Sequence, residues 1–207
     1  MKFQWIVLAL ALGAGLLTRF IVDQNGNTAS TTQAPSQGQN SSVDIHSLYS
    51  GKETINLFAE DDKRLRIVYF GYTHCPDVCP TSLAVLSAAL QSLSQDDLTQ
   101  LWPAFITLDP DRDTPAKSAE YAGYFHANIT GLSGSDTQIK ALAEKYGVLY
   151  MRTEMKDSAM KYSVDHSSYF YLLQPDGTLV EKVPHTLNSA ILVDAITRNL
   201  PQQLATN

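Results

Sequence analysis

Cys75 and Cys79 are the only cysteines of this 207-residue chain, and three residues separate them. Two thiols at positions i and i+4 lie on one side of a helical turn, so they can close a disulfide or bind one soft metal ion together. A disulfide across so short a loop removes little entropy from the unfolded chain. Pro76 and Pro80 also restrict the loop backbone. The position of the pair therefore favours a functional site over an inert structural disulfide.

The cysteines lie between an expected strand and an expected helix. Residues 65–70 read LRIVYF, the pattern of a buried strand, and residues 81–90 read TSLAVLSAAL, the pattern of a helix. Pro80 then falls in the first helical turn, where a missing N–H costs little. Cys79 lies close to the helix N-terminus, where free N–H groups and the helix dipole favour a thiolate.

His166 differs from the other four histidines because it directly precedes residues 168–173, SYFYLL, an expected strand. A lone histidine is more often a hydrogen-bonded structural residue. Together with Cys75 and Cys79, however, it would form a mixed sulfur–nitrogen ligand set that suits Cu(I) and also accepts Cu(II). Structural zinc sites have four ligands, and no fourth Cys or His has a comparable placement. An open three-ligand site therefore favours copper.

The other histidines give weaker signals. His74 adjoins Cys75, so it either lowers the pKa of a thiol or is an exposed loop residue. His126 ends an expected helix, where a cation is favourable. For His46 and His185 the sequence suggests no functional role.

Two further groups of residues have alternative interpretations. Met155 and Met160 are either soft metal ligands or packing residues, and packing is the commoner role of methionine. Residues 109–115, DPDRDTP, lack the glycine and the further oxygens of a calcium loop. We expect a solvated turn there, with an Arg112–aspartate clamp, in which Asp111 or Asp113 orients the cysteine loop. Asp77, between the cysteines, would attract a cation.

The composition sets the domain organisation. Residues 1–22 are mostly apolar and about 20 residues long, close to one bilayer crossing, so we expect a membrane anchor rather than a cleaved signal peptide. Residues 23–43 are polar and predict a flexible linker. Residues 44–203 would form the folded domain. The net charge of −6 speaks against a nucleic-acid partner.

Within that domain the pattern predicts an α/β fold whose central sheet ends in a hairpin. The expected strands are 54–58, 65–71, 101–108, 148–153, 168–173 and 178–183, and the expected helices are 80–93, 115–126, 135–146 and 188–200. The turn between the last two strands is Pro-Asp-Gly, a strong hairpin signal. Thiols at the end of the first core strand, opening a helix, are typical of a thioredoxin-like central sheet flanked by helices.

Several motifs occur in an order that resembles the Sco/SenC family of copper proteins: residues 69–80 (YFGYTHCPDVCP), 109–115 (DPDRDTP), 131–134 (GLSG), 162–166 (YSVDH) and 175–177 (PDG). The resemblance covers residues 58–200. The region before Leu65 departs from the family, because it is shorter than the usual strand-rich beginning.

The resemblance implies a thioredoxin-like domain on a membrane anchor, with Cu+ or Cu2+ bound by Cys75, Cys79 and His166. It implies a metallochaperone that assists assembly of the dinuclear copper site of cytochrome c oxidase. The partners would be the copper-site subunit or another copper protein, and the location would be a bacterial inner membrane with the domain facing the periplasm. The alternative is a thiol–disulfide oxidoreductase with Cys75 and Cys79 as its redox-active pair and thiol–disulfide exchange partners. Redox enzymes of this fold usually place two residues between the cysteines, whereas three intervene here.

Overall fold

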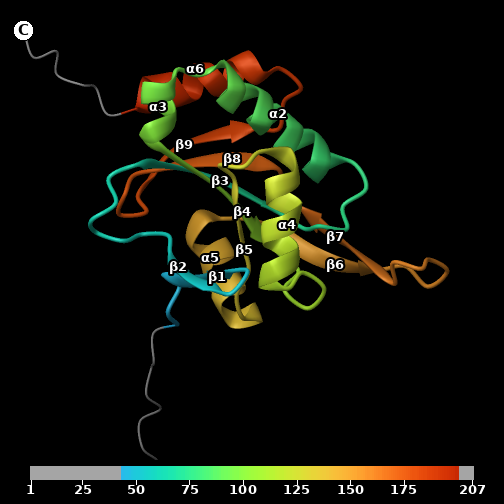
Figure 1. Cartoon of the computed structure of the whole chain (residues 1–207). Coiled ribbons are helices and arrows are strands. Elements are labelled where there is room, and N and C mark those ends of the chain that lie inside the picture. The colour runs from blue at the N-terminus through green and yellow to red at the C-terminus, as the bar shows by residue number, and fades with distance from the viewer. Residues whose placement is uncertain (1–42, 201–207) are drawn as a thin grey trace, which may run out of the picture. The chain divides into compact units, whose positions relative to one another are not determined.

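The structure, a computed structural model, describes residues 43–200 (Figure 1). The anchor predicted for residues 1–22 and nearly all of the linker predicted for residues 23–43 lie outside the described residues. Among residues 43–200, no helix combines the length and the apolar composition that crossing a membrane requires.

A mixed five-stranded sheet forms the centre of the domain. In spatial order its strands are β5 (Thr130–Leu132), β4 (Leu101–Thr107), β3 (Leu65–Gly71), β8 (Tyr169–Leu173) and β9 (Leu179–Pro184). The strands β3, β4 and β5 run parallel, and β8 and β9 form the expected antiparallel hairpin. The sequence pattern did not predict β5, because three residues carry too little periodicity.

The sheet is covered by helices. These are α2 (Val78–Ser92), α3 (Gln95–Thr99), α4 (Pro115–Phe125), α5 (Asp136–Tyr146) and α6 (Ser189–Asn199). Local signals explain where several of them begin, because Ser135 and Gln138 form a capping box and Thr114 accepts a hydrogen bond from a backbone N–H. The short helix α3 was not predicted.

The helices lie on both faces of the sheet (Figure 1). Neighbouring residues of a strand point to opposite faces. The Tyr146 ring of α5 lies 6.2 Å from the rings of Phe70 and Tyr171, on one face. On the other face, the Tyr121 ring of α4 lies 5.3 Å from the Phe105 ring. The helices α2 and α6 pack against each other on the side opposite α5.

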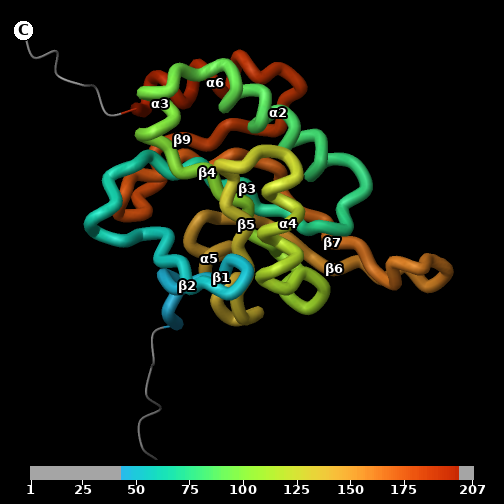
Figure 2. Tube along the Cα trace, viewed as in Figure 1, coloured from blue at the N-terminus to red at the C-terminus, as the bar shows by residue number. Residues whose placement is uncertain are grey.

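Two small hairpins lie outside the central sheet. The first joins β1 (Ser47–Ser50) to β2 (Glu53–Asn56), whereas the sequence predicted a single strand at 54–58. The second joins β6 (Tyr150–Glu154) to β7 (Tyr162–His166) and projects from the body of the domain (Figure 2). We call residues 150–166 the β6–β7 arm. The sequence predicted a strand at 148–153 but not its pairing with β7.

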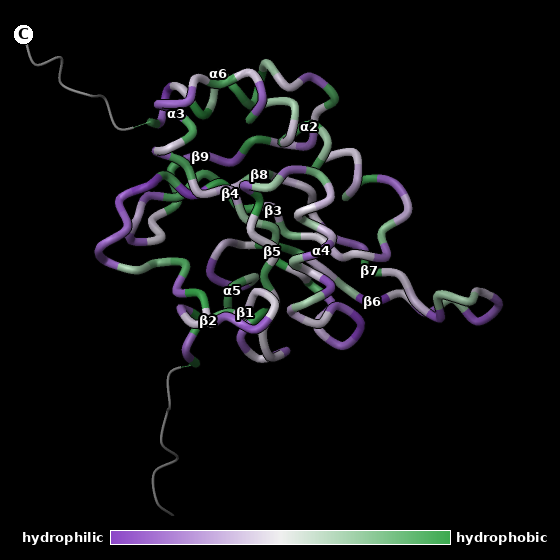
Figure 3. The backbone as a smooth tube through the Cα atoms, viewed as in Figure 1, coloured by the Kyte–Doolittle hydropathy of each residue, from purple (hydrophilic) through white to green (hydrophobic). Residues whose placement is uncertain are grey.

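Burial is concentrated in the sheet. All seven residues of β3 are buried, whereas β6 has no buried residue. Apolar residues accordingly gather in the central strands, and hydrophilic residues mark much of the outer turns (Figure 3). The site described next lies where this buried sheet meets the exposed arm.

Candidate metal centre

The strand directions bring the two halves of the candidate site together. The parallel strands β3 and β4 end at the same edge of the sheet, and the cysteine loop follows β3 there. Strand β8 runs antiparallel to β3, with Phe170 opposite Tyr69, so β8 begins at that edge. His166 lies just before β8 and therefore reaches the cysteines from a distant part of the chain.

The two cysteines are free thiols at the beginning of α2. Cys79 is fully buried in the first turn, and Cys75 is half-buried in the loop before it. The backbone N–H of Cys79 donates a hydrogen bond to the sulfur of Cys75, with an N–S distance of 3.4 Å. The sequence predicted that the N–H groups at the helix terminus would favour a thiolate at Cys79, whereas in the structure this N–H contacts the sulfur of Cys75.

His166 turns a ring nitrogen toward the sulfurs. Its Nε2 lies 3.3 Å from the Sγ of Cys79, and its Nδ1 lies 3.1 Å from the carbonyl oxygen of Ser167. Because that carbonyl can only accept, the N–H at Nδ1 donates to it, and Nε2 is the ring nitrogen that faces the sulfurs. The rings of Tyr69 and Tyr72 pack edge-on against the imidazole at 6.3 and 6.2 Å. These contacts fix the orientation of the His166 ring.

The environment drives the pKa values of the two thiols apart. A hydrogen bond from Cys79 lowers the pKa of Cys75 to about 3, against the opposing effect of burial, and His166 contributes in the same direction. The pKa of Cys79 is raised, because its thiol donates that hydrogen bond, is buried and lies beside the Cys75 sulfur. The pair therefore rests as one thiolate at Cys75 and one thiol at Cys79.

The three side chains are neighbours without forming a finished ligand cage. Within residues 43–200, no group of three or more His, Cys, Asp or Glu side chains is already arranged to hold a metal ion. His166 instead makes its contact with the Cys79 sulfur. Chemically, two sulfurs and one imidazole nitrogen suit a soft, thiophilic ion such as Cu(I).

A cavity of about 390 Å³ opens beside the cysteines. Cys75 and His166 line it together with Tyr72 and Val164, and the carboxylate residues Asp77 and Asp165 and the methionines Met155 and Met160 also contribute to its wall. A metal ion or an acceptor group could therefore approach the half-buried sulfur of Cys75 from this side.

Gly71, the last residue of β3, is a site residue that the sequence reasoning missed. A Cβ there would lie 2.9 Å from the Sγ of Cys79, 3.0 Å from the Tyr69 ring and 3.2 Å from the Phe105 ring. Only a residue without a side chain leaves room for the buried sulfur. The signal was a glycine at the end of a buried strand, which often marks a close approach.

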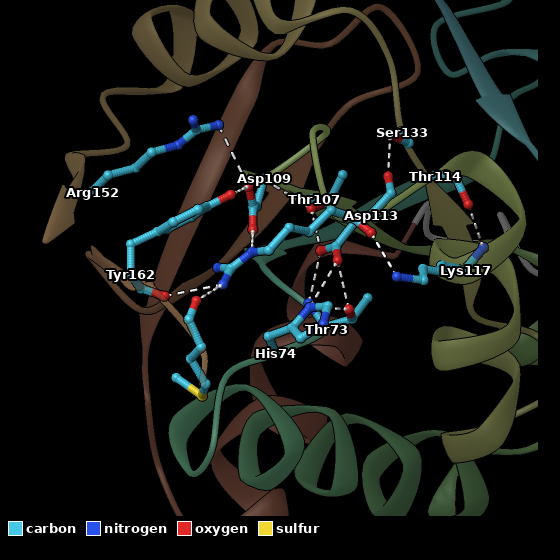
Figure 4. A network of polar contacts seen from close by, with 12 residues as sticks. Thr73, His74, Thr107, Asp109, Asp113, Thr114, Lys117, Ser133, Arg152 and Tyr162 are labelled. Atoms are coloured by element: carbon cyan, nitrogen blue, oxygen red, sulfur yellow. Dashed lines mark hydrogen bonds and ion pairs between the residues drawn. The ribbon is translucent and has the colours of Figure 1, made fainter. Parts of the chain in front are cut away.

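The turn after β4 differs from the solvated turn that the sequence predicted. Asp109 and Asp113 are fully buried, and only Asp111 is well exposed. Asp113 accepts hydrogen bonds from the backbone N–H of Thr73 at 2.8 Å and from the hydroxyl of Thr107 at 2.7 Å (Figure 4). Of the two aspartates considered, Asp113 is thus the one that orients the segment before the cysteines. The turn is buried because it fills the edge where β3 and β4 end.

The predicted Arg112–aspartate clamp is present, and it has a second function that the sequence did not reveal. The Nε of Arg112 contacts the carboxylate of Asp109, and its Nη1 donates to the backbone carbonyls of Met160 and Tyr162, both at 3.0 Å. The hydroxyl of Tyr162 donates to Asp109 at 2.7 Å (Figure 4). Burial, with the hydrogen bond to Asp109, raises the pKa of Tyr162 to about 12. This network fastens the arm that carries His166.

The remaining histidines lie in other environments. His74 contacts Thr73 and Asp113, His185 shares a 2.8 Å hydrogen bond with Ser82, and His46 packs edge-on against Phe58. His126 ends α4, and its Nδ1 accepts a hydrogen bond from the N–H of Asn128. His166 is therefore the histidine that the fold brings to the cysteines.

A mixed sheet with free thiols after its first core strand, at the start of a helix and with helices on both faces, defines a thioredoxin-like α/β fold. A solved structure of this fold, Arabidopsis thaliana ScoI with copper bound, superposes with a TM-score of 0.65 at 36% identity. The match covers 73% of this chain and 93% of that one.

Sequence relatives agree with this structural match. A mitochondrial SCO1 homologue of Arabidopsis thaliana is 35% identical over 94% of this chain, although the chain spans only 60% of that protein. A SCO2-like protein of Rickettsia felis is 35% identical over 83% of this chain and 84% of its own length. The family model described as SCO1/SenC matches residues 58–200. The chain belongs to the SCO1/SenC family.

Proposed function

We propose that this chain is a copper metallochaperone that binds copper through Cys75, Cys79 and His166 and assists assembly of the dinuclear copper site of cytochrome c oxidase. The observation that carries the proposal is the 3.3 Å contact between the Nε2 of His166 and the Sγ of Cys79, beside the half-buried sulfur of Cys75. A relative of 36% identity has been solved with copper bound, which supports copper as the metal.

The site combines tight binding with release in the following way. The sulfurs of Cys75 and Cys79 provide soft donors for Cu(I), and the imidazole of His166 provides a donor that Cu(II) also accepts. The cavity leaves one side of Cys75 open, so an acceptor protein could offer its own thiols there. Each Cu–sulfur bond can then be exchanged in turn, without a free ion in solution.

His166→Ala tests this proposal on the full-length chain. We expect weaker Cu(I) binding in a chelator competition and a changed thiolate-to-Cu(II) absorption, because one of three donors is lost. His126→Ala, at the end of α4, is the matched control and should leave both unchanged. Undiminished affinity and an unchanged spectrum in His166→Ala would contradict the proposed ligand set.

A second candidate function is thiol–disulfide exchange, favoured by the low pKa of Cys75 and the adjacent Cys79 thiol. The Cys75 thiolate would attack a partner disulfide, and Cys79 would then resolve the mixed disulfide. The partner would gain two electrons and two thiols, while Cys75 and Cys79 would become a disulfide. An oxidised peptide carrying the two cysteines of the oxidase copper site tests this activity, and absence of turnover would remove the candidate.

We further propose that residues 1–22 anchor the protein in a bacterial inner membrane, with the domain facing the periplasm. The support is the apolar composition of that segment, followed by the polar residues 23–43. Protease treatment of spheroplasts tests the orientation, because a periplasmic domain would be digested in intact spheroplasts. Protection of the domain until the membrane is broken would contradict it.

A further inference from the structure

The methionines of this chain are unevenly distributed. Three of the four, Met151, Met155 and Met160, lie in the β6–β7 arm, and the fourth is Met1. Methionine ordinarily fills irregular gaps in an apolar core. The hydrophobic core of residues 43–200, including the partly buried residues packed against it, contains no methionine. Packing in the core therefore does not account for these side chains.

Two of the three methionines lie at the candidate metal centre. Met155 and Met160 line the same cavity as Cys75 and His166, whereas Met151 does not line it. Met155 is 37% exposed and Met160 is half-buried, so both lie at the border between the cavity and solvent. Their positions form an outer wall, and the cysteines lie deeper.

The backbone holds this part of the arm in place. The N–H of Met155 donates to the carbonyl of Lys161 at 2.7 Å, which brings the residues on the two sides of the loop together. The carbonyl of Met160 accepts from the N–H of Tyr162 at 2.7 Å and from Arg112 at 3.0 Å. The loop that carries both thioethers is thus fastened to the body by the network that also positions His166.

We propose that Met155 and Met160 form a thioether site that receives Cu(I) at the mouth of the cavity and passes it to Cys75, Cys79 and His166. Thioethers are soft, neutral ligands that suit Cu(I) and bind hard cations poorly. The inference rests on the proposed copper function and deepens it. Asp77 and Asp165, also in the cavity wall, would attract the cation without selecting it.

The transfer is a ligand exchange in which no electron moves. Bonds from copper to the sulfurs of Met155 and Met160 break as bonds to the sulfurs of Cys75 and Cys79 form, and copper stays Cu(I) throughout. The proton of the Cys79 thiol leaves to water. Neutral donors release the ion readily, because the thiolate side binds it more strongly.

The first test uses Ag+, a stable probe with the preferences of Cu(I), and the full-length Cys75→Ser/Cys79→Ser variant. With methionine methyl groups labelled with carbon-13, we expect Ag+ to shift the signals of Met155 and Met160 while that of Met151 stays in place. Met151 is 63% exposed on the same arm and is the internal control. Equal shifts at all three, or no shift, would overturn the proposal.

The second test measures how fast the otherwise unchanged full-length chain takes Cu(I) from a coloured chelator complex. Met155→Leu/Met160→Leu keeps size and apolar character, and such exchanges are usually tolerated. We expect uptake to slow at least fivefold while the equilibrium affinity changes less than twofold. Met151→Leu should match the wild type. An unchanged rate in the double variant would overturn the proposal.

The two tests separate this inference from the function on which it rests. If the wild-type cysteines fail to bind Cu(I), the proposed function fails, whereas the Ag+ shifts in the cysteine-free variant still report on the thioether site. If the cysteines bind Cu(I) but the Ag+ shifts are absent, the metallochaperone proposal stands and the thioether site is rejected.

Discussion

Cys79 is fully buried in the first turn of α2, whereas His166 closes an arm whose strand β6 has no buried residue. The sulfur half of the site is packed into the core against Gly71 and Tyr69. The nitrogen half contributes one residue of the arm, Val164, to the buried core, and it is otherwise held by polar contacts of Arg112 and Tyr162 and by the aromatic rings against His166. Segments with few buried apolar contacts open at a lower free energy than the core. The comparison indicates that the two cysteines stay in place while His166 can move away from them, as transfer of the metal to an acceptor would require.

The largest expected effect concerns how Cys75 is activated. Its pKa of about 3 keeps the thiolate populated at any higher pH, so its alkylation rate should be nearly flat between pH 5 and 8. The thiolate fraction of an ordinary cysteine rises roughly a thousandfold over that range. The measurement is iodoacetamide labelling followed by mass spectrometry of the Cys75 peptide.

Two variants show which half of the site causes this activation. Cys79→Ala removes the largest contribution, so the reactivity of Cys75 should again rise with pH in the neutral range. His166→Ala removes a smaller contribution and should leave the profile flatter than that of Cys79→Ala. If the alkylation rate of Cys75 in the wild-type protein rose steeply between pH 7 and 9, the lowered pKa of Cys75 would be refuted.

The next largest effect should come from removing Arg112, whose hydrogen bonds connect the β6–β7 arm to the body of the domain. Arg112→Leu removes the nearer of the two guanidinium partners of buried Asp109 and leaves only Arg152 at 3.4 Å, and breaking a buried ion pair costs about 3 kcal/mol or more. We expect the free energy of unfolding to fall by that amount in urea titrations. Copper affinity should fall as well, because the arm that carries His166 is released.

Asp111→Asn is the matched control for this experiment. Asp111 is 61% exposed and pairs with Arg152, so its loss should change stability by less than about 1 kcal/mol. If Arg112→Leu were as mild as Asp111→Asn, the arm would not depend on the buried network.

A smaller effect is expected from crowding the sulfur half. Gly71→Ala places a methyl group 2.9 Å from the Cys79 sulfur, and overpacking of a core costs about 1–3 kcal/mol. Urea unfolding measures the loss. Gly123→Ala in α4 meets no atom within 4 Å, and replacing an exposed helical glycine by alanine should stabilise by up to about 1 kcal/mol. If Gly71→Ala and Gly123→Ala changed the free energy of unfolding equally, the surroundings of the Cys79 sulfur would be less tightly packed than the distances indicate.

The smallest effect should be that of His166→Ala on stability. The substitution removes the edge-on contacts of the imidazole with Tyr69 and Tyr72, and such aromatic contacts contribute about 1 kcal/mol to stability. Thermal unfolding of the metal-free protein measures the change. A loss of several kcal/mol would mean that the imidazole belongs to the core as much as Cys79 does.

Local sequence signals accounted for much of the fold. The capping box at Ser135, the N-cap at Thr114 and the turn before β9 were predictable, because each depends on residues a few positions apart. The short strand β5 and the pairing of β6 with β7 were not. A strand of three residues is too short to show an alternation of apolar and polar residues. The pairing of β6 with β7 outside the central sheet leaves no such pattern in the sequence of either strand.

The buried polar turn shows a second limit. An aspartate-rich segment is usually solvated, and nothing in residues 109–113 indicates that two of its carboxylates are fully buried. Their partners are Thr73, 40 residues from Asp113, and Tyr162, 53 residues from Asp109. Such long-range contacts depend on how strands are ordered in the sheet, which local composition does not specify.

The sequence by itself determined the cysteine pair, its place between a strand and a helix, and the candidate histidine, because these follow from residue type and short spacing. Only the tertiary structure decided that His166, 87 residues from Cys79, lies against its sulfur and that Arg112 fastens the arm. The physical reason is the antiparallel insertion of β8 beside β3, which brings the beginning of one strand to the end of the other.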